Sequence, residues 1–195
     1  KNHMENLRVV FVMICRFVGE QMSLIFTRRA QNSDVDKIVQ ILNDATSFLK
    51  ESGSSQWQSG YPNRATVEDD IKNGCAWVLT VDNEVAGYAA VVIGREPTYA
   101  DIEGKWENNV DTYATIHRIA VSSKFRGMHL SQFFLSNIIS LTYAQGIHNF
   151  RIDTSRKNKI VQHIAVSHNF IERGIIQVTE DPVDSSRIAY ELNLR

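Results

Sequence analysis

The sequence predicts one α/β domain built around a mixed sheet. Runs of apolar residues with the spacing of strands alternate with runs that have the period of helices. Turn signals separate these runs, and the sequence contains no repeat, low-complexity tract or internal linker. A length of 195 residues is enough for one domain with a substantial core.

Each expected element follows from a local pattern. The expected elements are, in order, a strand (residues 23–30), a helix (33–52), a short helix (66–73), a hairpin (75–93), a strand (113–121), a helix (130–145), a strand (150–154), a helix (158–169) and two strands (171–178 and 187–193). Ser33 is expected to cap the first helix, with Asp36 three residues later, and Gly53 to end it. The hairpin is expected to turn at Asp82 and Asn83.

Apolar residues at helical spacing predict the buried face of each long helix. They are Val35, Ile38, Ile41, Leu42, Ala45, Phe48 and Leu49 in the first helix, Leu130, Phe133, Phe134, Ile138 and Leu141 in the third, and Ile160, Val161, Ile164 and Ala165 in the last. The connection over residues 94–112 is long for a compact domain, and long loops of this kind are often functional.

Charge and cysteine content exclude several classes of protein. A formal net charge of -1 argues against nucleic-acid binding, and the absence of a long Lys/Arg run argues against an electrostatic membrane anchor. Cys15 and Cys75 provide neither a disulfide framework nor the spacing of a metal site. We therefore expect no metal and a reduced, cytoplasmic compartment.

Residues 1–21 are expected to lie outside the functional domain, which covers residues 22–195. The apolar stretch over residues 7–18 is too short to span a bilayer, contains Arg16, and is not followed by a signal-peptide cleavage site. Residues 2–4 resemble a vector scar, and residues 19–22 can be encoded by a ribosome-binding sequence ahead of a start codon. We expect a tag and translated leader, with an apolar N-terminal arm as the alternative.

The stretch "KFRGMHLSQFF" (residues 124–134) predicts an anion site. It joins the strand "YATIHRIAV" to a helix, and the N-terminus of a helix offers unpaired N–H groups and a partial positive charge. Arg126 adds a charge capable of bidentate contact, and Gly127 permits a close approach of the main chain. By itself this pattern is weak, because Arg-Gly is common in such loops.

The order of elements and two sequence blocks resemble the GNAT superfamily of acyl-CoA-dependent N-acetyltransferases. "RIAVSSKFRGMHLSQFF" is similar to the family's strand, turn and R-G-x-G-x-G/A loop, and "FRIDTSRKNKIVQHIAVSHNF" is similar to its later strand and helix. The resemblance covers roughly residues 24–194. It implies a single domain with a mixed, mostly antiparallel sheet flanked by about four helices.

The resemblance also implies where acetyl-CoA, the co-substrate, would bind. The cofactor-binding residues that it implies are Ile119, Val121, Arg126, Gly127, Met128, His129, Leu130, Ser131 and Asn158. The end of the strand would pair with pantetheine as an added strand would. The main-chain N–H groups of residues 126–131 would hold the pyrophosphate, and Asn158 would reach the pantetheine arm.

Two departures from the family pattern affect this expectation. His129 and Ser131 stand where the family has its second and third glycines, although both keep their N–H donors. Ala165 stands where many members have a tyrosine that protonates the leaving thiolate. Alanine has no such proton, so the general acid is open.

Candidate residues for the acceptor side lie outside these blocks. Strand alternation predicts that His117 and Arg118 face opposite sides of the sheet. His117 is the candidate general base, with a hydrogen-bonded structural histidine as the alternative. Loop aromatics among acidic residues suit an amine through cation–π contacts, and structural packing is their alternative role. The candidate substrate-binding residues are Trp57, Tyr61, Tyr99 and Trp106.

We therefore expect an N-acetyltransferase that moves the acetyl group of acetyl-CoA to a primary amine by direct attack in a ternary complex. The alternative is a non-catalytic acyl-CoA-binding or regulatory module, which Ala165 favours. A Rossmann-type dinucleotide binder is disfavoured because no G-x-G-x-x-G follows the first strand. The sequence does not identify the acceptor, which is a small molecule or a peptide. It also leaves the oligomeric state open, with a homodimer as one option. We expect no nucleic-acid or membrane partner.

Overall fold

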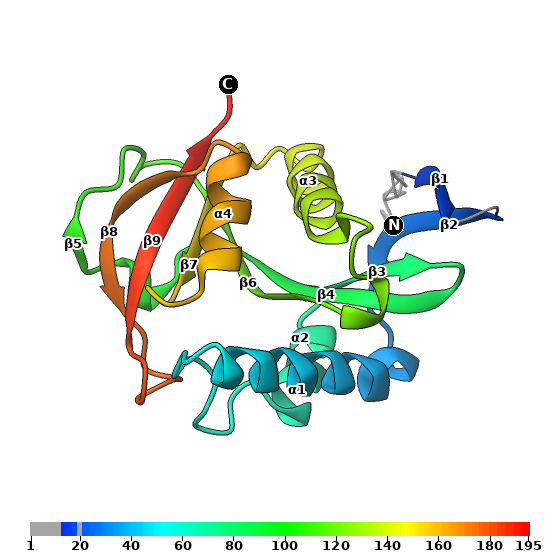
Figure 1. The fold of residues 1–195 in the computed structure, drawn as a ribbon. Helices are drawn as coiled ribbons and strands as arrows, with labels where there is room; N and C mark the ends of the chain where they lie inside the picture. The colour runs from blue at the N-terminus through cyan, green and yellow to red at the C-terminus, as the bar shows by residue number, and fades with distance from the viewer. Residues whose placement is uncertain (1–12, 19–20) are drawn as a thin grey trace, which may run out of the picture.

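The computed structural model describes residues 13–18 and 21–195 (Figure 1). The strands are β1 (Met13–Val18), β2 (Gln21–Arg29), β3 (Ala76–Val81), β4 (Glu84–Ile93), β5 (Ile102–Gly104), β6 (Tyr113–Val121), β7 (Asn149–Thr154), β8 (Ile171–Gln177) and β9 (Ser186–Asn193). The helices are α1 (Val35–Glu51), α2 (Arg64–Lys72), α3 (Leu130–Tyr143) and α4 (Lys159–Ser167), with 3-10 turns at Asn32–Asp34, Pro97–Tyr99 and Ser123–Phe125.

Within residues 13–18 and 21–195, nine strands form one mixed sheet in the order β1-β2-β3-β4-β6-β7-β9-β8-β5. All neighbours are antiparallel except β6 and β7, which run parallel and pair only from Tyr113 to Thr115 on the β6 side. Beyond Thr115 the two strands diverge, so residues 116–121 keep β4 as a partner on one edge and have no β7 partner on the other. The predicted fold class is confirmed.

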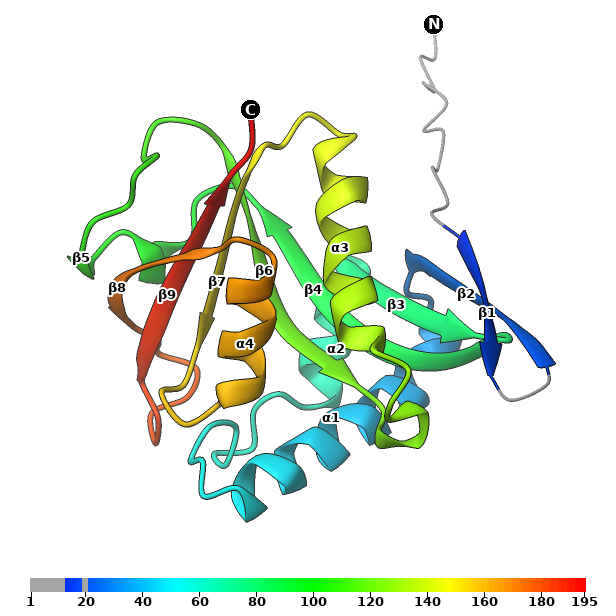
Figure 2. The same cartoon turned by 45° about the horizontal axis from the view of Figure 1, so that its top comes forward.

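Helices cover both faces of the sheet, as Figures 1 and 2 show. α1 and α2 lie on one face, over a core that includes Ile38 and Tyr88. α3 and α4 lie on the other face, over a larger core that includes Phe134 and Ile164. Burial of such side chains stabilises the fold by roughly 1.5–3 kcal/mol each.

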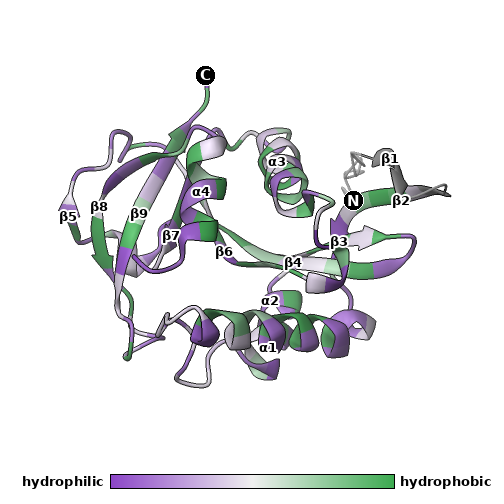
Figure 3. Cartoon of the chain, viewed as in Figure 1, coloured by the Kyte–Doolittle hydropathy of each residue, from purple (hydrophilic) through white to green (hydrophobic). Residues whose placement is uncertain are grey.

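The first helix begins differently from its expected start. Ser33 does not cap it, because residues 32–34 form a 3-10 turn and Asp34 stands at the N-cap. The Asp34 carboxylate instead accepts hydrogen bonds from the Gln31 N–H at 2.8 Å and from Arg28. α1 is amphipathic, with hydrophobic and hydrophilic residues alternating along it in Figure 3. Phe48, expected to be buried, is 43% exposed.

The hairpin between β3 and β4 turns at Asp82 and Asn83, as predicted. Their φ angles are 49° and 70°, which fits a two-residue turn in which both central residues are left-handed. The Asp82 carboxylate also accepts the Leu24 N–H at 2.8 Å, which ties the turn to β2.

A β-bulge interrupts β6 beside the expected site. Ala90 pairs with His117 and Tyr88 pairs with Ala120, so two β6 residues oppose one residue of β4. Arg118 lies at the bulge with a left-handed φ of 55°. The bulge breaks the alternation of side chains, and both His117 and Arg118 face the side of the sheet that carries α2. The prediction that they face opposite sides is therefore wrong.

Some elements had no sequence signal that predicted them. β5 has three residues and pairs with β8, and β1 pairs with β2 at the other edge of the sheet. The expectation of a leader or arm over residues 1–21 stays a prediction, and most of it lies outside the described residues. Among the described residues, no helix combines the length and the apolar character needed to cross a membrane.

Candidate active site

A cavity of about 700 Å³ lies where the end of β6 meets the N-termini of α3 and α4 and the second half of α1. Eight of the nine expected cofactor-binding residues line it: Ile119, Val121, Arg126, Gly127, His129, Leu130, Ser131 and Asn158. The cavity also runs along the edge of β6 that β7 leaves after Thr115. A strand edge without a partner can pair with an extended ligand.

The loop between β6 and α3 presents unpaired N–H groups to this cavity. Within the described part of the chain, the N–H groups of Gly127, His129, Leu130 and Ser131 have no hydrogen-bond acceptor, and all four residues line the cavity. Arg126 adds an exposed guanidinium at the same wall. This wall can bind an anion through main-chain donors and one cation.

Met128 departs from the expectation. It does not line the cavity; its side chain packs against the core under α3, and its N–H donates to the Phe125 carbonyl at 3.3 Å. The Arg126 N–H is likewise used inside the loop, by the Ser123 carbonyl at 3.1 Å. The donors facing the cavity are therefore fewer than the run of six that the family pattern implies.

His129 adopts a conformation that glycine adopts most easily. Its φ is 54° and its ψ is 31°, in the left-handed region, and Gly127 has a φ of 86°. A residue with a Cβ tolerates this region at a cost, which is absent for glycine. The His129 side chain is exposed, so the substitution changes the backbone energy and keeps the N–H in place.

Asn158 lines the cavity but both ends of its amide have protein partners. Its Oδ1 caps α4 by accepting the Val161 N–H at 3.2 Å, and its Nδ2 donates to Gln56 Oε1 at 3.0 Å. Ile160, expected to be buried, is 53% exposed and lines the cavity. Ala165 is fully buried in the core under α4, so no side chain of α4 supplies an acid from that position.

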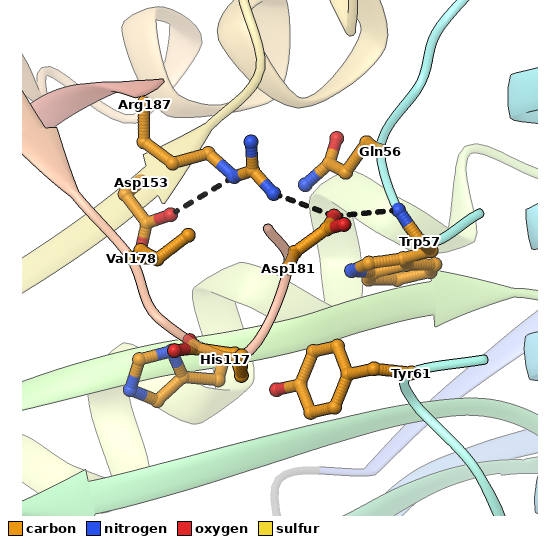
Figure 4. Close-up of a pocket in the computed structure, with 9 residues that line it drawn as sticks. Gln56, Trp57, Tyr61, His117, Asp153, Val178, Asp181 and Arg187 are labelled. Atoms are coloured by element: carbon orange, nitrogen blue, oxygen red, sulfur yellow. Dashed lines mark hydrogen bonds and ion pairs between the residues drawn. The ribbon is translucent and has the colours of Figure 1, made fainter. Parts of the chain in front are cut away.

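A second, smaller cavity of about 30 Å³ lies on the α2 side of the sheet (Figure 4). Its lining includes two aromatic side chains, Trp57 and Tyr61, together with His117, Asp153 and Arg187. Trp57 lines both cavities and has a left-handed φ of 66°. The two cavities are therefore adjacent, and Trp57 lies between them.

His117 lines the small cavity, and an acidic residue orients its ring. Its Nε2 lies 3.3 Å from Glu96 Oε1. The hydrogen bond from His117 holds the pKa of the Glu96 carboxyl below its ordinary value, so Glu96 is an ionised acceptor. Nε2 must then carry the proton, which leaves the lone pair of a neutral ring on Nδ1.

Two ionic networks hold the small cavity, one beside it and one in its lining, and no sequence pattern predicted either. In one, the buried Arg118 forms a bidentate pair with Asp70 of α2, with Nε–Oδ2 at 3.0 Å and Nη2–Oδ1 at 2.7 Å. Arg118 Nη1 also donates to the Tyr61 hydroxyl. Asp70 and Arg118 lie 48 positions apart in the sequence, so no local pattern connects them.

The other network centres on Arg187 of β9, whose side chain is 3% exposed. Its guanidinium contacts Asp181 and Asp184, each at 2.8 Å, and Asp153 at 3.8 Å. Asp181 in turn accepts the Trp57 N–H at 2.7 Å, as the dashed lines in Figure 4 show. The loop between β8 and β9 thereby holds the left-handed Trp57.

Tyr99 and Trp106 do not line either cavity. Both are buried in a small core, where the Trp106 ring N–H donates to the Tyr99 carbonyl at 2.9 Å. The Tyr99 hydroxyl donates to Asp153, which does line the small cavity. Their placement gives them a supporting position and argues against direct contact with an acceptor.

Comparison with known proteins agrees with this geometry. The family model described as "Acetyltransferase (GNAT) family" matches residues 36–170. A comparison with curated proteins found no match. Among solved structures, an acetyltransferase of the GNAT family from Streptococcus agalactiae is 39% identical, with a TM-score of 0.78 over 88% of this chain and 96% of that one.

More distant structures share the fold. A GNAT-family acetyltransferase from Listeria monocytogenes is 23% identical, with a TM-score of 0.68 over 93% of this chain and 100% of that one. An N-acetyltransferase from Staphylococcus aureus is 20% identical, with a TM-score of 0.63 over 88% of this chain and 99% of that one. The chain belongs to the GNAT family of acetyltransferases.

Proposed function

We propose that this GNAT-family protein transfers the acetyl group of acetyl-CoA to a primary amine by direct attack in a ternary complex. The observation that carries the proposal is the wall of the large cavity, where the N–H groups of Gly127, His129, Leu130 and Ser131 are unpaired within the described part of the chain. Such donors suit the phosphates of a nucleotide cofactor. The family generally uses acetyl-CoA, and the unpaired N–H groups and the free edge of β6 suit its phosphates and its pantetheine arm.

Residues of this chain have distinct roles in holding acetyl-CoA. The loop N–H groups and Arg126 would bind the phosphates, and the free edge of β6 from Ile119 to Val121 would pair with the pantetheine arm. Asn158 would contribute mainly by starting α4 at the cavity wall, because its amide is already engaged. When bound, acetyl-CoA supplies an acetyl group that its thioester has already activated.

The small cavity would receive the acceptor amine. His117 is the proposed base, because Glu96 orients its ring and leaves Nδ1 able to accept a proton from the amine. Trp57 and Tyr61 would form the walls that position the amine between the two cavities. Positioning would provide most of the acceleration, since a correctly oriented amine reacts readily with a thioester.

Binding of acetyl-CoA tests the wall of the large cavity that carries the unpaired N–H groups and Arg126. At a concentration about 100 times its dissociation constant, a ligand stabilises the native state by about 2.7 kcal/mol, which raises Tm by roughly 5–10 °C for a chain of this length. Arg126→Glu places a negative charge at the phosphates and should remove most of this shift. Arg64→Glu, an exposed charge reversal on α2, is the matched control and should keep it.

Transfer itself is tested by mass spectrometry of a panel of amines, from small amines to peptides, incubated with acetyl-CoA and protein. We expect one class of amine to gain an acetyl group, and His117→Ala to slow the reaction by about 100-fold or more.

The buried Ala165 favours the second candidate function, a non-catalytic acyl-CoA-binding module. Acetyl-CoA binding without acetylation of any amine would support that module. The expected cytoplasmic location and the homodimer stay predictions.

A further inference from the structure

Arg118 occupies a position that joins the two cavities. The residue before it, His117, lines the small cavity, and the residue after it, Ile119, lines the large one. Its own φ of 55° makes the bulge that turns these neighbours to different sides. The conformation of Arg118 therefore determines where His117 lies in the small cavity and where Ile119 lies in the large one.

The side chain of Arg118 is fixed by a partner on another element. Asp70 of α2 takes two of its donors, and the side chains are only 11% and 10% exposed. Asp70 is also held by the Tyr88 hydroxyl of β4 and the Cys75 thiol ahead of β3. Removing one member of a buried pair leaves the other charge uncompensated, so this arrangement strongly resists displacement of Arg118.

The remaining donor of Arg118 acts on the small cavity. Nη1 donates to the Tyr61 oxygen, so that oxygen serves as an acceptor and its own proton is available to another group. Burial raises the pKa of the Tyr61 hydroxyl, against the effect of Arg118, so the hydroxyl keeps this proton at neutral pH. Figure 4 shows the hydroxyl directed toward the His117 side of the cavity.

We infer that the Asp70–Arg118 pair is a lock that positions both halves of the site. Through the bulge it sets the β6 wall of the large cavity, and through Tyr61 it sets a hydrogen-bond donor in the small one. Arg118 is thus a positioning residue, and Tyr61 is the residue that donates to the acceptor molecule. The acceptor is then an amine that carries a hydrogen-bond-accepting oxygen near the reacting nitrogen. The role in transfer rests on the proposed function, whereas the lock itself does not.

The chain offers a matched control for this lock. Arg28 forms a second bidentate pair, with Asp34 at 2.6 and 2.9 Å, and both residues lie away from the two cavities. Arg118→Lys and Arg28→Lys each keep a positive charge and lose the planar fork. Tyr61→Phe removes only the hydroxyl and leaves the ion pair intact.

The experiment combines hydrogen–deuterium exchange with steady-state kinetics on these three variants. Arg118→Lys should speed exchange in both residues 56–61 and residues 117–121. It should also lower kcat by about tenfold or more, because a small displacement of the reacting groups slows the reaction steeply. Tyr61→Phe should raise the acceptor KM by about 3–10-fold with a smaller change in kcat. Arg28→Lys should change neither the exchange of these segments nor the kinetics.

Two results would overturn the inference. In the first, Arg118→Lys shows the same exchange and kinetics as Arg28→Lys. In the second, Tyr61→Phe lowers kcat and leaves the acceptor KM unchanged, which would assign Tyr61 to proton transfer. If the wild-type protein acetylates no amine, the proposed function fails, and the exchange comparison of Arg118→Lys with Arg28→Lys still decides whether the lock exists.

Discussion

The two cavities are built by different means. The large cavity takes its donors from main chain, in the loop after β6 and at the free edge of that strand, and the charged residues that line it, Asp44, Glu51 and Arg126, are all exposed. The small cavity is held by side chains from distant elements, with Arg118 buried against Asp70 and Arg187 buried among three carboxylates. We expect a site of main-chain donors to tolerate a side-chain change such as His129 better than a buried ionic network tolerates the loss of a member.

The largest expected loss of stability follows from a substitution in the ionic network around Arg187. Arg187→Met would leave the buried Asp181 and the partly buried Asp153 and Asp184 without their cation. Breaking a buried pair typically costs about 3–5 kcal/mol, and in a chain of this length Tm should fall by on the order of 10 °C. Thermal unfolding of the purified variant measures this loss.

The corresponding substitution in the large cavity, at Arg126, provides the comparison for Arg187→Met. Arg126→Met removes an exposed arginine, so the free energy of unfolding should change by less than about 0.5 kcal/mol. Equal losses of Tm in the two variants would contradict the distinction between the cavities. Partial recovery of the Arg187→Met loss by a second change, Asp181→Asn, would confirm that uncompensated charge causes it.

The contrast between the cavities also explains what the sequence could predict. The β6–α3 wall of the large cavity is contiguous in the sequence, so "RIAVSSKFRGMHLSQFF" and the segment starting at Asn158 contain the eight expected residues that line it, whereas the lining residues from α1 had no such signal. The small cavity draws Trp57, Asp153 and Arg187 together from separate segments, and its ionic partners lie far apart in the chain. Local periodicity contains no information on such pairs.

The bulge at Arg118 marks a second limit of prediction. Alternation of side chains assumes a regular strand, and "HRIAV" has no glycine to signal a break. The left-handed φ at Arg118 coincides with the buried ion pair to Asp70. Tertiary contacts therefore override the local preference of the strand at this position, and the face of His117 relative to Arg118 was mispredicted.

A smaller effect is expected at His129. His129→Gly should leave Tm unchanged or raise it by about 2–3 °C, because glycine removes the strain of the left-handed backbone but gains entropy in the unfolded chain. His129→Val should lower Tm, because a β-branched residue is strained in this region. Calorimetric titration should give an acetyl-CoA dissociation constant within about threefold of wild type for His129→Gly, since the N–H remains. Weaker binding by the glycine variant would show that the imidazole of His129 itself contacts acetyl-CoA.

The smallest effect concerns an Arg–Asp pair outside both cavities. Burial alone would raise the pKa of the Asp34 carboxyl, but hydrogen bonds from Arg28 and the Gln31 N–H outweigh it and lower this pKa. A depressed pKa stabilises the fold above the unfolded value of about 3.9, and this stability is lost as pH falls through the folded pKa.

The Tm difference between wild type and Asp34→Asn should therefore stay constant from pH 7 to 5 and shrink below about pH 4. Thermal unfolding across this range measures it. A difference that already disappears between pH 7 and 5 would show that ionised Asp34 is not what stabilises this pair. The result calibrates what such a pair contributes to folding alone, for comparison with Asp70–Arg118.

We propose that main chain binds acetyl-CoA and that a side-chain network positions the amine. Steady-state kinetics with both substrates varied test it most directly, on Arg126→Glu and Tyr61→Phe. We predict that Arg126→Glu raises the KM for acetyl-CoA by about tenfold or more and changes the acceptor KM little, because its charge opposes the phosphates. Tyr61→Phe should show the reverse pattern. If both variants raise the same KM, or each raises both, the division of the site into two differently built halves is contradicted.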